Sequence, residues 1–555
     1  MSLRFIALSG TTAVTENLYI YEYIRGGGGD KEMIVVDCGV GFPETEMYGV
    51  DLVIPDFDYI KENKSKLKGI LISHGHEDHI GALPFLLKDV KVPVYATKLV
   101  AGFIDNKLVD QKVKGVDLRV FDSERDVITL GSFKVTPFRV SHSVPGGVGF
   151  AIDTPDGRVL HVADYKFDWT PVDEKPFDIG KAAELANKGV LAVASDCLGA
   201  TTPGYTESEK QIEGRIENIV RRATGQVYFT TISSNISRMQ QAINVATRLG
   251  RRVSFIGRST EAKAMIAKDL GFLKYPSQAV LTSKQMARLP KDERMYIISG
   301  SYGQPGSALY RVTMDEHDTL SIDAHDTVIF SSDPAPPGSK ANVDLLVDKL
   351  IEIDADVHYY DLQEDLHVSG HGSQEDIKTL FALASPRYFI PIGGTVRHMR
   401  AYRDIAATMG AKPQEVFELM PGEIVEFSNG IAKKAGKIPV KDVLVDGLGI
   451  GDVGNVVLRD RAILAQEGVA IVLISVDRKN SRLINQPEII SRGFVFEKKK
   501  KGFLINAGRE LARNIERRGK VEKMSARNIT IDFLEKFFYK ETGRRPMILP
   551  VIVEI

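Results

Sequence analysis

A short segment of the chain, GILISHGHEDHIGALPFLL, carries four side chains that can bind a metal ion. His74, His76, Asp78 and His79 lie within six residues, after an apolar run at 69–73 and before a second apolar run. The first run predicts a buried strand and the second a helix, and loops between such elements often carry functional side chains. Mixed nitrogen and oxygen donors suit zinc, with Mn²⁺ as an alternative. The chain has only 11 histidines, so three in this loop favour a metal site over packed or solvated histidines.

Two further candidate ligands stand where other predicted strands end. His142 ends the run TPFRVSH, and Asp164 ends the run RVLHVAD. We expect both at one edge of the sandwich that these strands would form, where strands end and loops begin, because the ligands of one site can lie together at such an edge. A carboxylate such as Asp164 can bridge two cations, and a hydroxide held between them would be the nucleophile for hydrolysis. For His142 taken alone, an ordinary surface histidine is the alternative interpretation.

The elements that must position these residues change in character along the chain. The first two hundred residues alternate short apolar runs with polar turns, which predicts a β-rich sandwich that carries helices. From Thr206 longer helical stretches alternate with strands, a pattern typical of a parallel sheet. Strand-rich sequence returns near residue 356, so we expect the α/β segment to be inserted into the first domain. A linker rich in Gly, Lys and Pro then precedes a small α+β domain.

Composition places the chain among ordinary globular proteins. Its 555 residues predict about three or four domains. A net charge of −1, with 26% charged and 43% hydrophobic residues, excludes wholesale disorder. Residues 441–555 hold 22 Lys+Arg against 15 Asp+Glu, a net charge of +7 that a negatively charged partner could use. Only Cys38 and Cys197 occur, and no apolar run approaches the ~20 residues of a membrane span, so we expect a cytoplasmic protein.

The metal motif and its surroundings resemble a known family. HGHEDHIG is similar to the signature of the metallo-β-lactamase fold, and VDLVIPDFDYI, SHSVP and ADYKFD are similar to ribonuclease J, a group of β-CASP nucleases. HVSGHGSQEDIKTL and the terminal RRPMILPVIVEI extend the resemblance over the whole chain. The implied fold is α/β, a metallo-β-lactamase αββα sandwich with an inserted β-CASP domain and a small C-terminal α+β domain. The expected boundaries are 1–205 and 356–428 for the sandwich, 206–355 for the β-CASP domain, 429–446 for a linker and 447–555 for the C-terminal domain.

The resemblance assigns the candidate ligands to two cations. It implies that His74, His76 and His142 hold one cation, that Asp78 and His79 hold the other, and that both share Asp164. Zinc is the expected metal, with Mn²⁺ or Mg²⁺ as alternatives.

The chain departs from the family pattern at one ligand position. The family has a histidine in a strand-end motif of the type Pro-Val-His-Gly-Glu, whereas this chain reads Pro-Ile-Gly-Gly-Thr, with Gly393 at the ligand position. We therefore expect the second cation to lose a donor. Smaller departures are Ala163 for a glycine, Ser237 for a histidine, and SDCLGA at 195–200 for a Ser-Asp-Ser-Thr-like run.

Substrate contacts are expected from two loops. In HVSGH, comprising His367, Val368, Ser369, Gly370 and His371, the serine and the last histidine can donate to phosphate oxygens. By resemblance, His371 would also act as the general acid that protonates the leaving oxygen. Ser234 and Asn235 open a predicted helix, where free N–H groups favour an anion, although both are equally good N-caps.

The expected function is hydrolysis of RNA phosphodiesters. The resemblance implies a metal-dependent ribonuclease with endonuclease and 5′-to-3′ exonuclease activity on single-stranded RNA in RNA processing and decay. It also implies a homodimer or homotetramer, or a hetero-oligomer with a paralogue. The alternatives are a weakly active RNA-binding subunit, suggested by Gly393 and Ser237, and a small-molecule hydrolase, which the large insertion disfavours.

Overall fold

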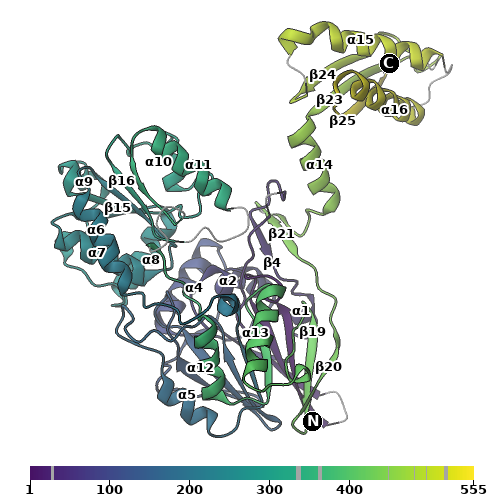
Figure 1. Ribbon diagram of the computed structural model, residues 1–555. Coiled ribbons are helices and arrows are strands. Elements are labelled where there is room, and N and C mark those ends of the chain that lie inside the picture. Colours follow the sequence, from purple (N-terminus) through teal and green to yellow (C-terminus); the bar gives the residue numbers. More distant parts are fainter. Residues whose placement is uncertain are drawn as a thin grey trace. The chain divides into compact units, whose positions relative to one another are not determined.

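The computed structural model divides the chain into two compact units (Figure 1). The larger unit comprises Met1–Phe42 and Leu52–Val443, and the smaller comprises Pro43–Asp51 and Leu444–Ile555. Among the described residues, none of the helices combines the length and the apolar composition that a membrane crossing requires. The described residues are 1–26, 30–44, 46–332, 339–360, 366–447, 449–480, 482–494, 497–517 and 523–555.

Two packed sheets form the centre of the larger unit. The strands of the first are β1 (Ser2–Ser9), β2 (Leu18–Arg25), β3 (Asp30–Val36), β5 (Leu67–Leu71), β6 (Val94–Ala96), β7 (Leu118–Val120), β19 (Glu423–Ser428) and β20 (Ile431–Lys437). The strands of the second are β8 (Ile128–Leu130), β9 (Phe133–Arg139), β10 (Val148–Thr154), β11 (Gly157–Val162), β12 (Ala192–Asp196) and β18 (Tyr388–Ile392). Their orders are β20-β19-β1-β2-β3-β5-β6-β7 and β18-β12-β11-β10-β9-β8. Phe5, Tyr21 and Phe150 are among the large apolar side chains buried in the core between them.

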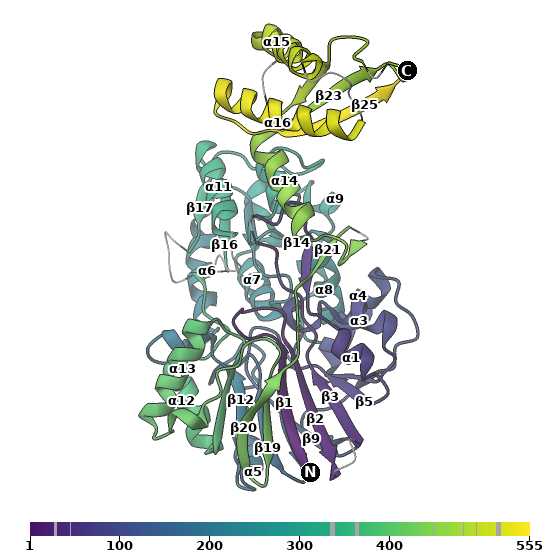
Figure 2. The ribbon, with the colours of Figure 1, turned by 90° about the vertical axis from the view of Figure 1, so that its right-hand side faces the viewer.

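Helices cover the outer face of each sheet, as Figure 2 shows. One layer contains α1 (Asp58–Glu62), α2 (Glu77–Ile80), α3 (Leu83–Asp89) and α4 (Lys98–Asp110), and the other contains α5 (Ile179–Ala186), α12 (Gln374–Ala384) and α13 (Val396–Thr408). In the second layer Ile377, Leu380 and Tyr402 pack with Phe138 and Leu160 of the sheet. Both faces of the sheets are therefore buried, and the predicted αββα sandwich is confirmed.

Neighbouring parallel strands bring several carboxyl ends to one edge of the sandwich. In the first sheet β3 and β5 run parallel, with Val36 opposite Leu71. In the second sheet β11, β12 and β18 run parallel, with Val162 opposite Ser195 and Asp196 opposite Ile392. The loops after parallel strands meet at the same edge, which is where α/β proteins bind ligands.

A parallel sheet with its own helices forms the inserted part of the larger unit. Its elements are α6 (Gln211–Arg222), β13 (Val227–Thr230), α7 (Ile236–Arg248), β14 (Arg252–Ile256), α8 (Arg258–Asp269), α9 (Ser283–Met286), β15 (Arg294–Ile298), α10 (Ala308–Thr313), β16 (Thr327–Phe330), α11 (Ser339–Glu352) and β17 (Asp356–His358). The strand order is β14-β15-β13-β16-β17. All of these pairs are parallel, as the alternation of helices and strands predicts.

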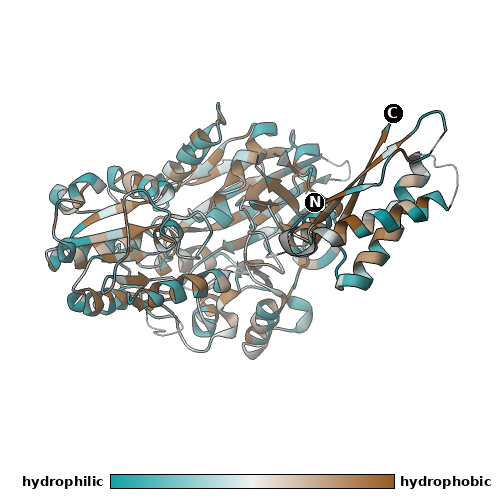
Figure 3. Ribbon diagram, turned by 90° about the horizontal axis from the view of Figure 1, so that it is seen from above, coloured by the Kyte–Doolittle hydropathy of each residue, from teal (hydrophilic) through white to brown (hydrophobic). Residues whose placement is uncertain are grey.

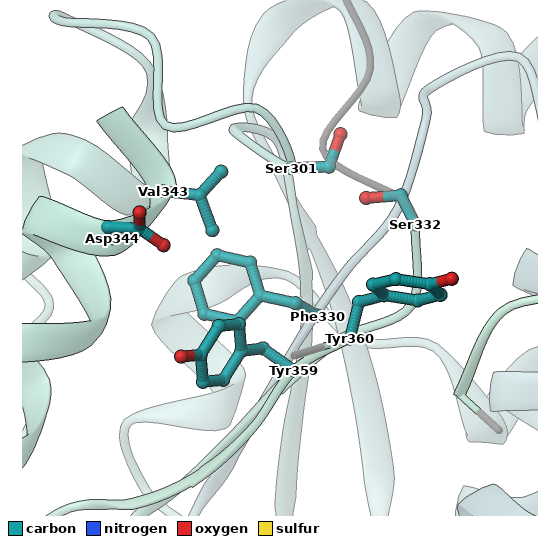
Figure 4. Close-up of a pocket in the computed structure, with 7 residues that line it drawn as sticks. All are labelled: Ser301, Phe330, Ser332, Val343, Asp344, Tyr359 and Tyr360. Carbon is teal, nitrogen blue, oxygen red and sulfur yellow. The ribbon is translucent and has the colours of Figure 1, made fainter. Parts of the chain in front are cut away.

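The carboxyl ends of three of these strands border a small pocket. Its lining includes Phe330 at the end of β16, Tyr359 directly after β17, and Ser301, which follows β15 by a few residues. Figure 4 shows the side chains of Ser301 and Ser332 at one end of the pocket, with the ring of Tyr360 below Ser332. The pocket is lined by aromatic rings and hydroxyl groups, and its lining includes none of the candidate metal ligands.

Two segments differ from the sequence prediction. Asp356–His358, expected to return to the sandwich, form β17, because they pair in parallel with β16 of the inserted sheet. Ile431–Lys437, expected within the linker 429–446, form β20 and pair antiparallel with β19. β20 is an edge strand with mostly exposed side chains, and its lysines are typical of an edge that resists further pairing. The remaining boundaries stay predictions.

The smaller unit is a three-stranded sheet packed against helices. Its elements are α14 (Asn455–Glu467), β23 (Val469–Val476), β24 (Glu488–Arg492), α15 (Glu497–Glu516), α16 (Lys523–Thr542) and β25 (Met547–Glu554). The strand order is β24-β23-β25. Val472 and Ile474 pack in one core with Leu511 and Phe538. In Figure 3 the strand that ends at the C-terminus is largely brown, so this α+β unit has a strongly apolar sheet.

Candidate metal centre

The ends of four strands and one short helix position the candidate ligands. His74 and His76 follow β5, Asp78 and His79 lie on α2, and His142 follows β9. Asp164 follows β11 and Asp196 ends β12. The structure brings all the predicted metal ligands together, and the atoms of each cluster lie within 4.8 Å of one another.

The first cluster contains three imidazoles and one carboxylate. His76 Nδ1 lies 3.2 Å from His74 Nε2 and 3.1 Å from His142 Nε2. Asp164 Oδ2 lies 3.4 Å from His74 Nε2 and 3.6 Å from His142 Nε2. Four donors around one tetrahedral cation at about 2.1 Å are about 3.4 Å apart, so these distances match the edges of such a site.

Hydrogen bonds on the far side of the rings direct lone pairs into this cluster. His142 Nδ1 donates to the carbonyl oxygen of Gly370 at 2.7 Å, which leaves Nε2 without a proton in the neutral ring. Ser73 donates its hydroxyl proton to Asp37 at 2.7 Å and lies 3.1 Å from His74 Nδ1. The hydroxyl oxygen of Ser73 can therefore accept from His74 Nδ1, so that Nε2 of His74 also carries a lone pair.

The electrostatics of the first cluster favour the neutral forms of His76 and His142. Burial lowers the pKa of His76 well below its ordinary value, and the neighbouring His142 and His74 reinforce this effect. Burial also lowers the pKa of His142, and His74 acts in the same direction. Neutral imidazoles whose lone pairs converge beside a carboxylate have no proton between them for a hydrogen bond, but they can bind a divalent cation.

The second cluster joins Asp78, His79 and the other oxygen of Asp164. His79 Nε2 lies 3.4 Å from Asp78 Oδ2 and 3.5 Å from Asp164 Oδ1. His79 Nδ1 is 2.8 Å from Asp37 Oδ2, which fixes the ring. Because Oδ1 of Asp164 faces this cluster and Oδ2 faces the first, Asp164 is placed between two donor sets, as the sequence predicts for a shared ligand.

Negative charge dominates the second cluster. Burial alone would lower the pKa of His79, but Asp164, Asp78 and Asp37 outweigh burial and raise that pKa well above its ordinary value. Burial would raise the pKa of Asp164, yet His79, His371 and His74 hold it well below its ordinary value. The excess of carboxylates is the type of environment that a cation neutralises, so the residues present fit a metal.

Gly393, the glycine at the expected ligand position, lies beside Asp196 and Asn17. It follows β18 with φ of +68°, a left-handed conformation that favours glycine. A Cβ atom built there would meet only Asp196 Oδ1 at 3.5 Å and Asn17 Oδ1 at 4.0 Å. A Cβ at 393 therefore has ordinary contacts and no clash, and a role of this position at the second cation stays a prediction.

His371 stands beside the cluster and is held by Asp196. His371 Nδ1 lies 2.7 Å from Asp196 Oδ2, and its Nε2 lies 3.9 Å from Asp164 Oδ2. Burial would lower the pKa of His371, but Asp196 and Asp164 raise it to about 9. Burial raises the pKa of Asp196 even though His371 opposes this effect. The two carboxylates therefore favour the protonated form of His371 beside the candidate metal ligands.

The HVSGH loop packs tightly around these residues. A Cβ on Gly370 would lie 2.5 Å from the His142 ring, so only glycine allows the loop to approach this closely. The side chain of Ser369 accepts a hydrogen bond from the backbone N–H of His371 at 3.1 Å. Val368 is buried, whereas Ser369 is exposed. Of the expected substrate contacts in this loop, Ser369 has an exposed polar side chain, and those of His367 and His371 are partly exposed.

The second expected substrate loop, Ser234 and Asn235, has a structural role at the start of α7. Asn235 caps α7, because its side-chain oxygen accepts from the backbone N–H of Arg238 at 2.9 Å. Ser234 and Asn235 are both buried. The N-cap interpretation is thus realised for Asn235, and a role of either residue in substrate binding stays a prediction.

Sequence reasoning missed three residues that support the site. Asp37 fixes His79, and Asp196 fixes His371. Both end or follow apolar strands, which is the signal that identified Asp164. Lys166 is buried and donates to the carbonyl oxygen of Ser369 at 3.0 Å, which anchors the HVSGH loop. No sequence pattern predicts this contact, because it joins residues 203 positions apart.

Four family models match the chain. They are "Metallo-beta-lactamase superfamily" at residues 13–195, "Ribonuclease J, beta-CASP domain" at 224–350, "Zn-dependent metallo-hydrolase RNA specificity domain" at 351–416 and "Ribonuclease J C-terminal domain" at 456–555. The order of these models agrees with a sandwich that contains an inserted domain and is followed by a C-terminal domain.

Curated relatives match the chain from end to end. Ribonuclease J2 of Bacillus subtilis (strain 168) is 38% identical over 559 residues, which cover 100% of this chain and 99% of that protein. Ribonuclease J 1 of Streptococcus pyogenes serotype M3 is 34% identical, with 99% of this chain and 97% of that protein covered. A crystal structure of a protein of unknown function from Enterococcus faecalis V583 shares the fold, with a TM-score of 0.51, 14% identity and coverage of 78% of this chain and 100% of that chain.

Proposed function

The chain belongs to the ribonuclease J family of metal-dependent RNA nucleases, and we propose that it cleaves RNA phosphodiester bonds at the cluster centred on Asp164. The observation that carries this proposal is the placement of Asp164 between two donor sets. Its Oδ2 faces His74 and His142, and its Oδ1 faces His79. A weakly active RNA-binding subunit is not favoured, because the donor sets on both sides of Asp164 are assembled.

The residues would hold two cations in the arrangement expected from the sequence. His74, His76 and His142 would hold one, Asp78 and His79 the other, and Asp164 both. Bound divalent cations would lower the pKa of a water molecule and stabilise negative charge on the phosphate. Imidazoles with carboxylates suit Zn²⁺, and the larger share of carboxylates in the second cluster keeps Mn²⁺ and Mg²⁺ as alternatives.

His371 is the proposed general acid. Its side chain lies at the edge of the cluster, with Nδ1 fixed on Asp196 and Nε2 turned toward Asp164. A pKa raised to about 9 keeps a proton available at neutral pH. In RNA cleavage this proton would go to the leaving ribose oxygen, and Asp196 would stabilise the imidazolium until the transfer.

The proposed substrate is single-stranded RNA, cleaved internally and from its 5′ end. Ser369 and His371 would donate to phosphate oxygens near the scissile bond, and Ser234, Asn235 and the loop around His367 and Val368 would contact the strand. Such contacts would serve RNA processing and decay, including ribosomal and messenger RNA. Buried, unpaired Cys38 and Cys197 fit the reducing cytoplasm that we propose as the location.

The smaller unit would support assembly rather than chemistry. On β23 and β25, Ile471, Leu473, Leu549 and Val551 are exposed, and Ile471 lies beside Leu549 and Leu473 beside Val551. An apolar patch of this kind marks an interaction surface. We propose that it joins copies of this chain into a homodimer or homotetramer, with a paralogue as an alternative partner.

A cleavage assay tests the proposed activity. The purified protein is incubated with Mn²⁺ or Zn²⁺ and with internally labelled RNA that carries a 5′-monophosphate or a 5′-triphosphate. We expect internal fragments from both RNAs and nucleotides released from the 5′ end of the monophosphorylated RNA. An unstructured DNA of the same sequence is the control for RNA specificity. Absence of RNA cleavage with every metal would contradict the proposal.

A further inference from the structure

The amide of Asn17 borders the second cluster, which has fewer donors than the first. Asn17 precedes β2 and is only 1% exposed. Asn17 Nδ2 lies 3.1 Å from His79 Nε2, 3.3 Å from Asp78 Oδ2 and 3.2 Å from the backbone carbonyl oxygen of Asp78. These separations resemble the distances between the candidate ligands of the first cluster, which span 3.1 to 3.6 Å. One end of the Asn17 amide therefore occupies a position that a metal ligand would take.

The backbone holds Asn17 in this position. Its N–H donates to the carbonyl oxygen of Asp78 at 3.0 Å, and its carbonyl oxygen accepts from the N–H of Gly39 at 3.0 Å. Asn17 is thus tied directly to the residue that supplies a ligand to the same cluster. The side chain has little freedom to leave, so its amide must face Asp78 and His79 with either its oxygen or its nitrogen.

The hydroxyl of Tyr19 indicates which end faces the cluster when a cation is bound. This hydroxyl lies 2.9 Å from the carbonyl oxygen of Gly10 and 2.7 Å from the other end of the Asn17 amide. It has one proton, which Gly10 can accept, and it then accepts from an amide N–H. With nitrogen toward Tyr19, both contacts of the hydroxyl are satisfied. The oxygen of Asn17 then faces His79 and two oxygens of Asp78, an arrangement of lone pairs that only a bound cation would stabilise. A half-turn of the amide exchanges its oxygen and nitrogen and leaves the rest of the side chain in place.

Gly393 gives a second reason for a ligand at this place. A Cβ at 393 would lie 4.0 Å from the Tyr19-facing end of the Asn17 amide, so a side chain at 393 would be a direct neighbour of Asn17. The family resemblance implies a histidine ligand at this position, where this chain has Gly393. We propose that the amide oxygen of Asn17 completes the second cation site in place of the side chain that Gly393 lacks. This inference rests on the proposed function, because it assumes that the Asp164 cluster binds two cations.

Two substitutions separate a ligand from a hydrogen-bond donor. Asn17→Asp keeps an oxygen at the same place and adds charge, so a ligand role predicts that the second cation stays bound. If Asn17 instead donates N–H groups to Asp78, the new carboxylate would repel Asp78 and weaken the site. Asn17→Ala removes both functions. Tyr19→Phe keeps the ring and removes only the hydroxyl that orients the amide.

The experiment measures bound metal per chain and the affinity of each cation. Each full-length variant is stripped with chelator, titrated with Mn²⁺ and, separately, Zn²⁺, and checked for folding by circular dichroism. We expect two cations in the parent protein and in Asn17→Asp. In Asn17→Ala we expect the weaker cation to bind at least about tenfold less tightly, with the first cation unchanged. Tyr19→Phe should weaken the same cation by a smaller factor, and it provides the test if Asn17→Ala fails to fold.

Three outcomes would overturn the inference. These are equal affinity for both cations in Asn17→Ala or, if that variant does not fold, in Tyr19→Phe; loss of the second cation in folded Asn17→Asp; or a parent protein that binds only one cation. The last two outcomes leave the proposed ribonuclease function standing, because the first site remains. A parent protein that binds no metal would instead contradict the proposed function itself.

Discussion

Two regions depart from the usual pattern of buried apolar and exposed polar side chains, and they do so in opposite ways. They are the metal cluster of the larger unit and the sheet face of the smaller unit, which is the apolar patch on β23 and β25. The cluster buries polar groups, since His79, Asp37 and Asp164 are at most 6% exposed. The sheet face exposes aliphatic groups, including Leu473 and Val551. Buried polar groups are costly unless paired or bound to a cation, and exposed apolar patches are costly unless covered. The first region therefore points to chemistry and the second to a partner.

The largest effect is expected from the cluster itself. His76→Ala and Asp78→Ala each remove a proposed metal ligand, so we predict loss of RNA hydrolysis by more than ~100-fold, because even a supporting residue behind a ligand costs ~10–100-fold. RNA affinity, measured by fluorescence anisotropy, should stay within a few fold, since we assign these residues to the metal and not to the strand. Cleavage at the parent rate in either variant would show that the metal assignment is wrong.

A smaller effect is expected at the edge of the cluster. His371→Ala should lower kcat by about 10²–10⁴-fold, the usual contribution of a general acid. Its metal content should not change, because the imidazole is assigned to proton transfer. Asp196→Asn, which keeps the shape but weakens the hold on His371, should cause a milder loss. If the metal content of His371→Ala falls with its activity, then His371 is a ligand and the proposed acid must be sought elsewhere.

Gly393→His tests the departure from the family pattern. The added imidazole should tighten the second cation and raise cleavage at limiting Mn²⁺, by a larger factor in an Asn17→Ala background than in the parent. The left-handed φ of +68° should cost about 1–2 kcal/mol of stability. Gly393→Ala carries the same strain without a donor and is the matched control in thermal melts and metal titrations. Identical titrations for the alanine and histidine variants would place residue 393 outside the metal site.

The smallest effect on chemistry is expected from the second region. Removal of residues 447–555 should convert an oligomer to a monomer by light scattering, while cleavage of a short RNA per chain changes only a few fold. Leu473→Lys should also weaken assembly, because it places a charge on the exposed sheet face. Val109→Lys, at a position that is 66% exposed in the larger unit, is the control. A truncated protein that keeps its oligomeric state would refute the role assigned to the sheet face.

The sequence predicts more of the metal cluster than of its support. His74, His76, Asp78 and His79 are close in sequence, and Asp164 ends an apolar strand, so residue type and local pattern suffice to find them. The contact of Gly370 with His142 joins residues 228 positions apart and depends on the packed fold. Asn17 gives no sequence signal, since its relation to Asp78 and His79 arises only when two loops meet at the sheet edge.

The errors in the fold prediction have a similar origin. β17 and β20 are short or polar strands whose membership in a sheet depends on a neighbour strand, not on their own composition. The lysines of β20 are typical of both a linker and an edge strand. The exposed sheet face of the smaller unit has the same types of aliphatic residue as a core. The sequence alone therefore does not distinguish a face buried inside the unit from an exposed one.

The most direct test of the central claim compares metal content and RNA cleavage in one sample of parent protein and of Asp164→Asn. Each sample is analysed by mass spectrometry of metals before chelation, after chelation and after metal is added back. We predict two cations and cleavage in the parent protein, loss of both on chelation, and recovery of both together. Asp164→Asn should bind metal weakly and stay inactive. Undiminished cleavage by chelated parent protein, or by metal-free Asp164→Asn, would contradict a metal centre built around Asp164.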